Sequence, residues 1–112
     1  MTLKVLPERQ PLFVRLSDGS IQNKYTFKVL NKTDKVVNVK VIAEGGIKDQ
    51  VIIGSEKPLP THPGRGTSFT IFLKAAGKNI HQEVTPVKFR VQSVDDPQIG
   101  AEYATKFNGP KP

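Results

Sequence analysis

Histidine is the residue type that most readily exchanges protons near neutral pH, and the chain has two, His62 and His81. Hydrolysis or group transfer also needs a nucleophile and a partner that orients the base. His62 lies in a proline-rich segment and His81 in a polar connection, so we expect both to be exposed loop residues. On its residues alone, the segment is not expected to be an enzyme.

Cysteine is absent from the 112 residues, which also contain one methionine. The absence excludes thiolate zinc sites, iron–sulfur clusters and thiol nucleophiles built from this segment alone. A zinc or copper site asks for three or four converging ligands, and two separated histidines fall short of that number. We therefore expect no catalytic, metal-binding or cofactor-binding residue within the segment.

Basic residues exceed acidic ones by 17 to 10, for a net charge of +7. The excess is spread evenly, with no run of adjacent basic residues, which is typical of a solvated surface. This distribution predicts neither a nucleic-acid partner nor binding to an anionic membrane surface. The longest unbroken apolar stretches, such as Val51–Ile53, have only a few residues, far below the roughly 20 residues that span a bilayer. Direct insertion of the segment into a membrane is therefore not expected.

Apolar and polar residues alternate with a period of two, which predicts an all-β fold. In one segment, Tyr25, Phe27 and Val29 share one face, while the two lysines and the threonine that alternate with them share the other. Such strands are expected at 12–16, 21–30, 35–43, 47–53, 67–75, 85–93 and 100–107. About seven short strands in about 100 residues predict an immunoglobulin-like antiparallel β-sandwich, with a small barrel as the alternative.

Proline and glycine mark the expected boundaries. Residues 1–10 are expected to be an entering linker, residues 11–108 the sandwich domain and residues 109–112 a tail. A proline-rich stretch at 57–64 predicts a long connection at a sheet edge.

Two exposed turns, at 18–23 and 31–34, are where a protein partner would be sought, although hairpin geometry explains their residue types equally well. Phe72 falls on the opposite strand face from Phe69 and Ile71, and would either wrap an edge or contact another domain. The candidate interaction residues are Asp18, Ser20, Asn23, Asn31, Lys32 and Phe72.

The run Asp18-Gly19-Ser20-Ile21-Gln22-Asn23, the run Leu30-Asn31-Lys32-Thr33 and the closing Phe107-Asn108-Gly109-Pro110 carry a family resemblance. The chain resembles the immunoglobulin-like C-terminal domain of the FixG (CcoG) family of bacterial membrane-bound iron–sulfur proteins. The resemblance is most specific in the first third of the chain. Between 35 and 100 it rests on the strand pattern and on the Pro/Gly connections.

The resemblance implies a non-catalytic structural or interaction domain on the periplasmic face of the bacterial inner membrane. The parent would be an oxidoreductase with 4Fe-4S clusters that acts in assembly of cbb3-type cytochrome c oxidase, through electron transfer or copper supply. Implied partners are the parent's membrane portion, an oxidase subunit or a copper-handling protein. No cluster residue carries over to a chain without cysteine. The alternative is a free-standing periplasmic or secreted sandwich that binds peptides by edge-strand addition.

Overall fold

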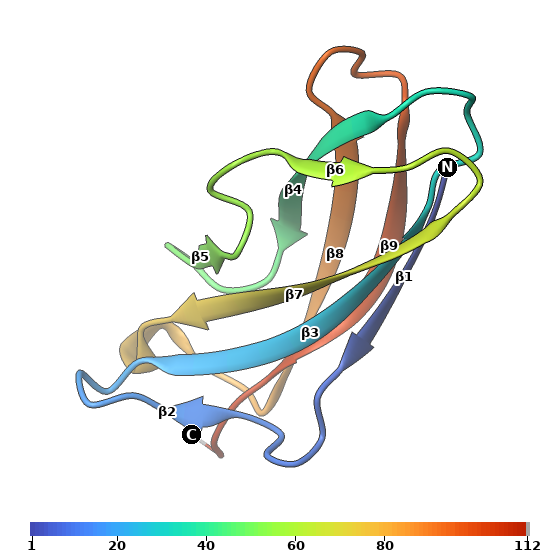
Figure 1. The fold of residues 1–112 in the computed structure, drawn as a ribbon. Helices are drawn as coiled ribbons and strands as arrows, with labels where there is room; N and C mark the ends of the chain where they lie inside the picture. Colours follow the sequence, from blue (N-terminus) through green and yellow to red (C-terminus); the bar gives the residue numbers. More distant parts are fainter. Residues whose placement is uncertain (112) are drawn as a thin grey trace.

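In the computed structural model, which describes residues 1–111, the chain forms nine strands and one short 3-10 helix. The elements are β1 (Thr2–Pro7), β2 (Val14–Arg15), β3 (Ile21–Leu30), β4 (Val37–Gly45), β5 (Val51–Ile53), β6 (Leu59–Thr61), β7 (Gly66–Ala75), η1 (Gly77–Asn79), β8 (Val84–Ser93) and β9 (Gly100–Asn108). Sheet A has the order β1-β3-β7-β5 with β2 also paired to β3, and sheet B has the order β6-β4-β8-β9. The two sheets pack face to face (Figure 1), which confirms the predicted sandwich.

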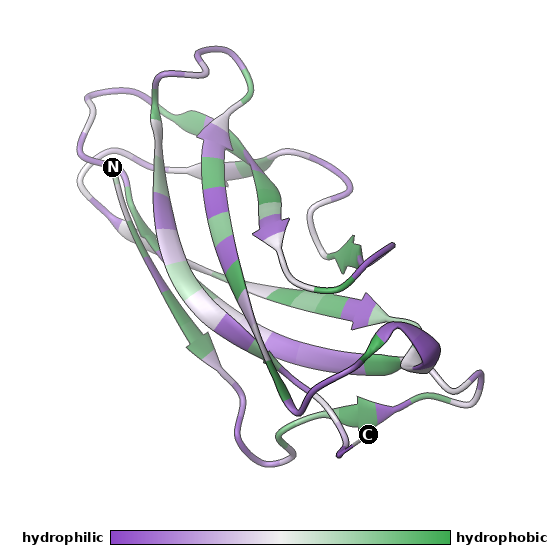
Figure 2. Ribbon diagram, turned by 180° about the vertical axis from the view of Figure 1, so that it is seen from behind, coloured by the Kyte–Doolittle hydropathy of each residue, from purple (hydrophilic) through white to green (hydrophobic). Residues whose placement is uncertain are grey.

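Alternation along the strands decides which side chains enter the space between the sheets. In β3, every odd-numbered residue from Ile21 to Val29 is buried, while the residues between them are exposed or half-buried. The same alternation is visible as bands of opposite hydropathy along the long strands in Figure 2. Each sheet is therefore apolar on its inner face and polar on its outer face, as a two-layer sandwich requires.

Three aromatic rings fill the centre of the core. Phe89 of β8 lies edge-on to Tyr25 and to Phe27 of β3, with ring centroids 5.0 Å apart in both pairs. All three side chains are fully buried. These contacts join the middle strands of the two sheets, so the core is continuous from one sheet to the other.

The first strand lies in a segment that was expected to be a linker. Residues 2–7 form β1, which pairs antiparallel with β3 from Thr2 opposite Leu30 to Pro7 opposite Tyr25. Leu3 and Val5 are buried in the core. The sandwich thus begins at residue 2 and not at residue 11, because pairing with β3 and burial of two apolar side chains add this segment to sheet A as an edge strand.

The proline-rich connection at 57–64 also contains a strand. Leu59–Thr61 form β6, which pairs with β4 at the edge of sheet B. Pro60 is tolerated there because an edge strand has one side without ladder partners.

The first residue of the expected tail, Gly109, is part of the folded domain. Gly109 is buried, and its N–H donates a hydrogen bond to the carbonyl of Glu83. Residue 112, the end of the expected tail, lies outside the described residues.

Replacing Phe89 by Ala should lower the free energy of unfolding by about 3–5 kcal/mol, because the change removes a ring that two others pack against. Urea denaturation followed by circular dichroism measures the loss. The control is Val94→Ala, at a side chain that is 40% exposed, with an expected cost below about 0.5 kcal/mol. Equal losses in the two variants would contradict a core centred on Phe89.

Candidate interaction site

Asp18 closes the turn that precedes β3. Its Oδ1 accepts a hydrogen bond from the Ser20 N–H at 2.9 Å, and Gly19 takes the positive φ of 86° that the turn requires. Oδ2 lies 3.7 Å from Nζ of Lys74 on β7. Hydrogen bonds from Ser20, followed by the charge of Lys74, hold the pKa of Asp18 below its usual value. The carboxylate is exposed, whereas Ser20 itself is buried.

Asn23 connects the two sheets at one end of β3. Its side-chain Nδ2 donates to the carbonyl of Asn108 at 2.7 Å, and its Oδ1 accepts from the N–H of the same residue at 2.8 Å. The hydroxyl of Tyr25 donates to the carbonyl of Lys106 at 2.8 Å, one step further along β9. We call this group of Asn23, Tyr25 and the two β9 backbone groups the amide clasp. β3 and β9 belong to different sheets and are not paired through their backbones, so the amide clasp provides the hydrogen bonds between them.

Asn31 makes the corresponding connection beyond the other end of β3. Its Nδ2 donates to the carbonyls of Lys35 at 2.8 Å and of Thr61 at 3.1 Å. Its Oδ1 accepts from both the N–H and the hydroxyl of Thr33. Thr61 belongs to β6 in sheet B and donates its own hydroxyl to the carbonyl of Val37. The side chain of Asn31 is fully buried, and every polar atom on it has a partner.

Asn23 and Asn31 were singled out as candidate contact residues, and their side chains are unavailable for that role. They are 2% and 0% exposed, and their hydrogen-bonding groups are used within the domain. The alternative drawn from the sequence, that these residue types serve turn geometry, describes Asn31, whose side chain bonds Thr33 and Lys35 in its own turn. Asn23 serves neither a turn nor a hairpin, because its side chain bonds the backbone of β9 in the other sheet.

Lys32 and Phe72 do lie at the surface, but they are far from each other. Lys32 is exposed in the loop after β3. Phe72 is half-buried on the outer face of sheet A, as the alternation predicted, with Lys24 and Ile53 as its register neighbours. β3 separates the Asp18 turn from the Lys32 loop by roughly 30 Å, at about 3.3 Å per residue. The six candidates therefore do not form one site.

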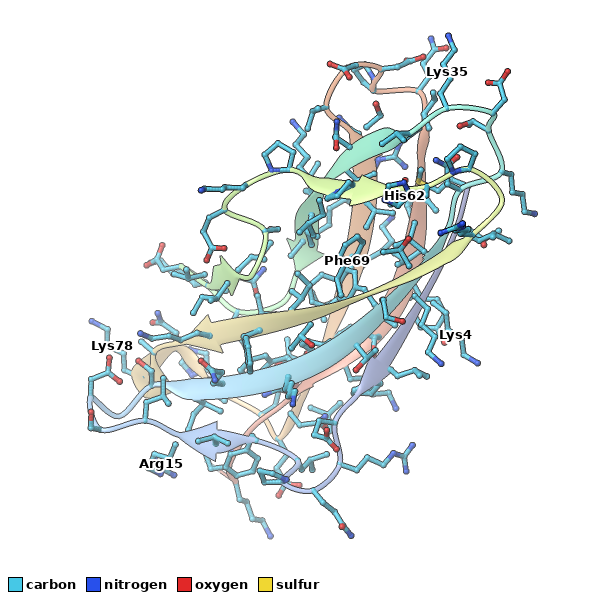
Figure 3. The ribbon with its side chains drawn as sticks, in the orientation of Figure 1. Lys4, Arg15, Lys35, His62, Phe69 and Lys78 are labelled. Atoms are coloured by element: carbon cyan, nitrogen blue, oxygen red, sulfur yellow. The ribbon has the colours of Figure 1, made fainter. Side chains whose placement is uncertain are left out.

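In the part of the chain that the structure describes, the two histidines, which the sequence offers as proton-transfer groups, are not brought together with a carboxylate in a hollow. His81 lines one of about 260 Å³ with Lys48 and Asn79, and no carboxylate lines it. His62 and His81 are both exposed, as expected, and Figure 3 places His62 beside the β6 edge. Within residues 1–111, no three histidine, aspartate or glutamate side chains converge in a way that could hold a metal ion.

Two antiparallel sheets, packed over an aromatic core and joined at their ends by buried polar side chains, define an immunoglobulin-like sandwich of the kind that serves as a structural or recognition module. The chain matches a family model over residues 1–110, described as "IG-like fold at C-terminal of FixG, putative oxidoreductase". The match covers nearly the whole chain, and the chain belongs to this family.

A solved structure shares the fold. The crystal structure of a FixG-related protein from Vibrio parahaemolyticus superposes with a TM-score of 0.79 at 23% sequence identity, covering 95% of this chain and 93% of that one. Among curated proteins, none matches the chain. In the described part of the chain, no helix has the length and apolar character needed to cross a membrane.

The amide clasp should contribute measurably to stability. Asn23→Ala removes the partners of one backbone N–H and one carbonyl on β9, and should lower the free energy of unfolding by about 1–3 kcal/mol. Gln22→Ala, on the adjacent outward-facing position, is the matched control and should change it by less than about 0.5 kcal/mol. Urea denaturation of both variants tests the prediction, and a silent Asn23→Ala would refute the role of the clasp.

Stability should fall in alkaline solution through Tyr25. Burial raises the pKa of Tyr25 above its usual value of about 10, so above that pH the unfolded chain loses a proton that the folded chain keeps. The contribution of Tyr25 to the free energy of unfolding is therefore fully present below about pH 10. Above that pH it declines by up to about 1.4 kcal/mol per pH unit. Unfolding midpoints measured across this range should decline less in Tyr25→Phe than in Tyr103→Phe. Matching slopes in the two variants would show that Tyr25 is not the group responsible.

Proposed function

We propose that this chain is a non-catalytic structural and interaction domain of a FixG-type membrane-bound iron–sulfur protein that acts in assembly of cbb3-type cytochrome c oxidase. The family match carries the proposal. The electron transfer or copper supply would be performed by other parts of the parent, since a chain without cysteine supplies no cluster thiolates. The domain would lie on the periplasmic face of the inner membrane.

Further support comes from how the chain uses its polar side chains. Among the described residues, no buried side-chain nitrogen or oxygen lacks a hydrogen-bond partner. The side chains of Asn23 and Asn31 join the two sheets, the hydroxyl of Thr61 joins β6 to β4 within sheet B, and none of the three is held ready for a ligand. An active site usually keeps some polar groups unsatisfied or perturbed for its substrate. This distribution favours a domain that acts through its outer surface.

Peptide capture by strand addition is the competing function, and the sheet edges provide few free backbone groups with which a peptide could pair. β5 and β6 are edge strands of three residues each, and β6 contains Pro60. The longer edges, β1 and β9, lie beside each other at one margin of the sandwich. A peptide would therefore have to enter a margin where two strands already adjoin, or pair with a very short edge.

Deletion of residues 2–109 from the gene in its native bacterium tests the proposed role. We expect cbb3-type oxidase activity and copper content of the membranes to fall, while the iron–sulfur electron paramagnetic resonance signal of the parent remains. A strain carrying Val94→Ala serves as the control for altered expression. Unchanged oxidase in a strain whose parent protein is present would contradict the role in assembly.

The reading frame upstream of Met1 provides an independent test of the parent. It should encode several apolar spans and cysteine clusters of the form Cys-x2-Cys-x2-Cys-x3-Cys. A signal peptide alone at that place would favour the free-standing sandwich instead.

A further inference from the structure

The two sheets differ sharply in charge, although the basic residues are spread evenly along the sequence. The strands of sheet A contain five basic residues and no acidic one: Lys4, Arg15, Lys24, Lys28 and Lys74. The strands of sheet B contain four basic residues and two acidic ones: Lys40, Lys88, Arg90, Lys106, Glu44 and Glu102. Folding therefore separates charges that the sequence mixes.

On sheet B, the acidic residues neutralise part of the outer face. Nζ of Lys88 lies 3.3 Å from Glu44 and 3.4 Å from Glu102, and Arg90 lies 3.4 Å from the same Glu102. Hydrogen bonds from Lys88 to Glu44 and then Glu102 raise its pKa above the usual value. Three lysines of sheet A, Lys4, Lys24 and Lys28, have no such ion pairs in the described part of the chain.

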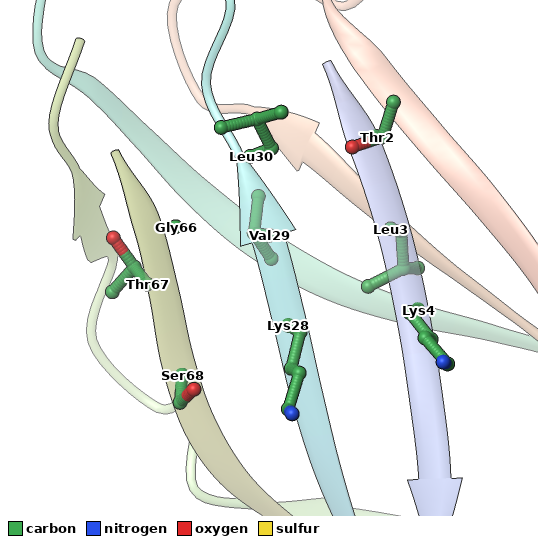
Figure 4. A pocket seen from close by; sticks show the side chains of 9 residues that line it. All are labelled: Thr2, Leu3, Lys4, Lys28, Val29, Leu30, Gly66, Thr67 and Ser68. Carbon is green, nitrogen blue, oxygen red and sulfur yellow. The ribbon is translucent and has the colours of Figure 1, made fainter. Parts of the chain in front are cut away.

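Lys4, Lys24 and Lys28 are exposed on the outer face of sheet A, and no carboxylate among the described residues lies within ion-pair distance of them. Lys4 stands directly opposite Lys28 in the β1–β3 register, and Figure 4 shows their side chains next to each other. Lys24 follows on the same face of β3, about 13 Å from Lys28 along the strand. Like charges at directly opposed positions destabilise a sheet, so this arrangement has a cost that a bound anion would remove.

Hydroxyl groups lie between and beside these lysines. Ser68 is the register partner of Lys28 on β7, and Thr26 stands opposite Thr70 in the next outward row. Lys4, Lys28 and Ser68 also line a shallow hollow of about 380 Å³, whose far side is formed by Gly66 and Thr2. Ammonium and hydroxyl groups are the donors that phosphate oxygens accept from. We call Lys4, Lys24 and Lys28, together with the hydroxyls of Thr26, Ser68 and Thr70, the lysine face.

We propose that the lysine face docks this domain onto the phosphate headgroups of an anionic lipid bilayer. Leu6, which is 37% exposed, and the half-buried Phe72 lie on the same side of sheet A and would meet the boundary between headgroups and acyl chains. Docking is peripheral and leaves the sandwich folded above the surface. It needs only the 112-residue chain and is independent of the parent proposed above.

The residue types of the lysine face fit a lipid surface better than they fit an acidic protein surface or a single-stranded nucleic acid. The lysine face contains no arginine, tyrosine or tryptophan, three of the residue types enriched in protein interfaces, and Phe72 beside it is half-buried. It consists mainly of lysine, which such interfaces contain less often than the rest of the surface. Single-stranded nucleic acid binds by stacking on exposed aromatic rings, and in the described strands of sheet A the one aromatic side chain on the outer face is the half-buried Phe72. Lysine is a flexible point charge, which suits headgroups that move and have no fixed geometry.

Sedimentation of the chain with lipid vesicles tests the proposal. We expect binding to vesicles of phosphatidylcholine mixed with phosphatidylglycerol, little binding to phosphatidylcholine alone, and weakening as salt shortens the screening length below about 10 Å. Each lysine near such a surface adds roughly fivefold to the partition coefficient, so the triple variant Lys4→Gln, Lys24→Gln, Lys28→Gln should lose on the order of a hundredfold.

The matched control removes three lysines from other parts of the surface, Lys35→Gln, Lys40→Gln and Lys57→Gln, with the same change in net charge. It should retain most of the binding. Urea denaturation establishes that both variants are folded, and the first should be no less stable than the wild type because an opposed lysine pair is gone. Equal losses in the two variants would overturn the proposal in favour of net charge alone. Absence of vesicle binding, or binding of polyglutamate or single-stranded DNA in its place, would overturn it too.

Discussion

Two buried asparagines hold together sheets that share no backbone ladder. Asn23 bonds both polar backbone groups of Asn108 in β9, and Asn31, beyond the opposite end of β3, bonds the carbonyl of Thr61 in β6. The apolar core supplies the driving force for packing, but hydrophobic contact has little directional preference. The asparagines supply direction, because a buried amide is satisfied at one register only. The relative placement of the sheets therefore depends on a few polar atoms at the ends of one strand.

The aromatic core and these amides reinforce each other. Phe89 contacts Tyr25 from the other sheet, and the hydroxyl of Tyr25 reaches the β9 backbone beside the Asn23 bonds. One residue thus takes part in both the apolar packing and the polar clasp. A shift of β9 along β3 would break the hydrogen bonds and disturb the rings together, which makes the native arrangement distinct from its neighbours.

Period-two alternation was sufficient to predict the sandwich and the long strands, because each strand buries one face. The same rule, applied to Asn23 and Asn31, would have placed both in the interior, since they share the parity of Tyr25, Phe27 and Val29. Turn chemistry favoured the surface for these two residues, and burial with complete hydrogen bonding decided otherwise. β1 was missed because six residues beside prolines give a weak signal. The uneven charge of the two sheets depends on strand order, which alternation does not reveal.

The ends of the domain lie at opposite ends of β3, since Thr2 pairs with Leu30 while Asn108 is bonded to Asn23. A pulling force applied between residue 2 and the end of β9 would run parallel to β1. It would load the β1–β3 hydrogen bonds together, in shear, and would not open them one after another from one end. A sandwich attached at these two points is thus oriented to resist tension, and β1, added at the margin of sheet A, is the strand that bears it.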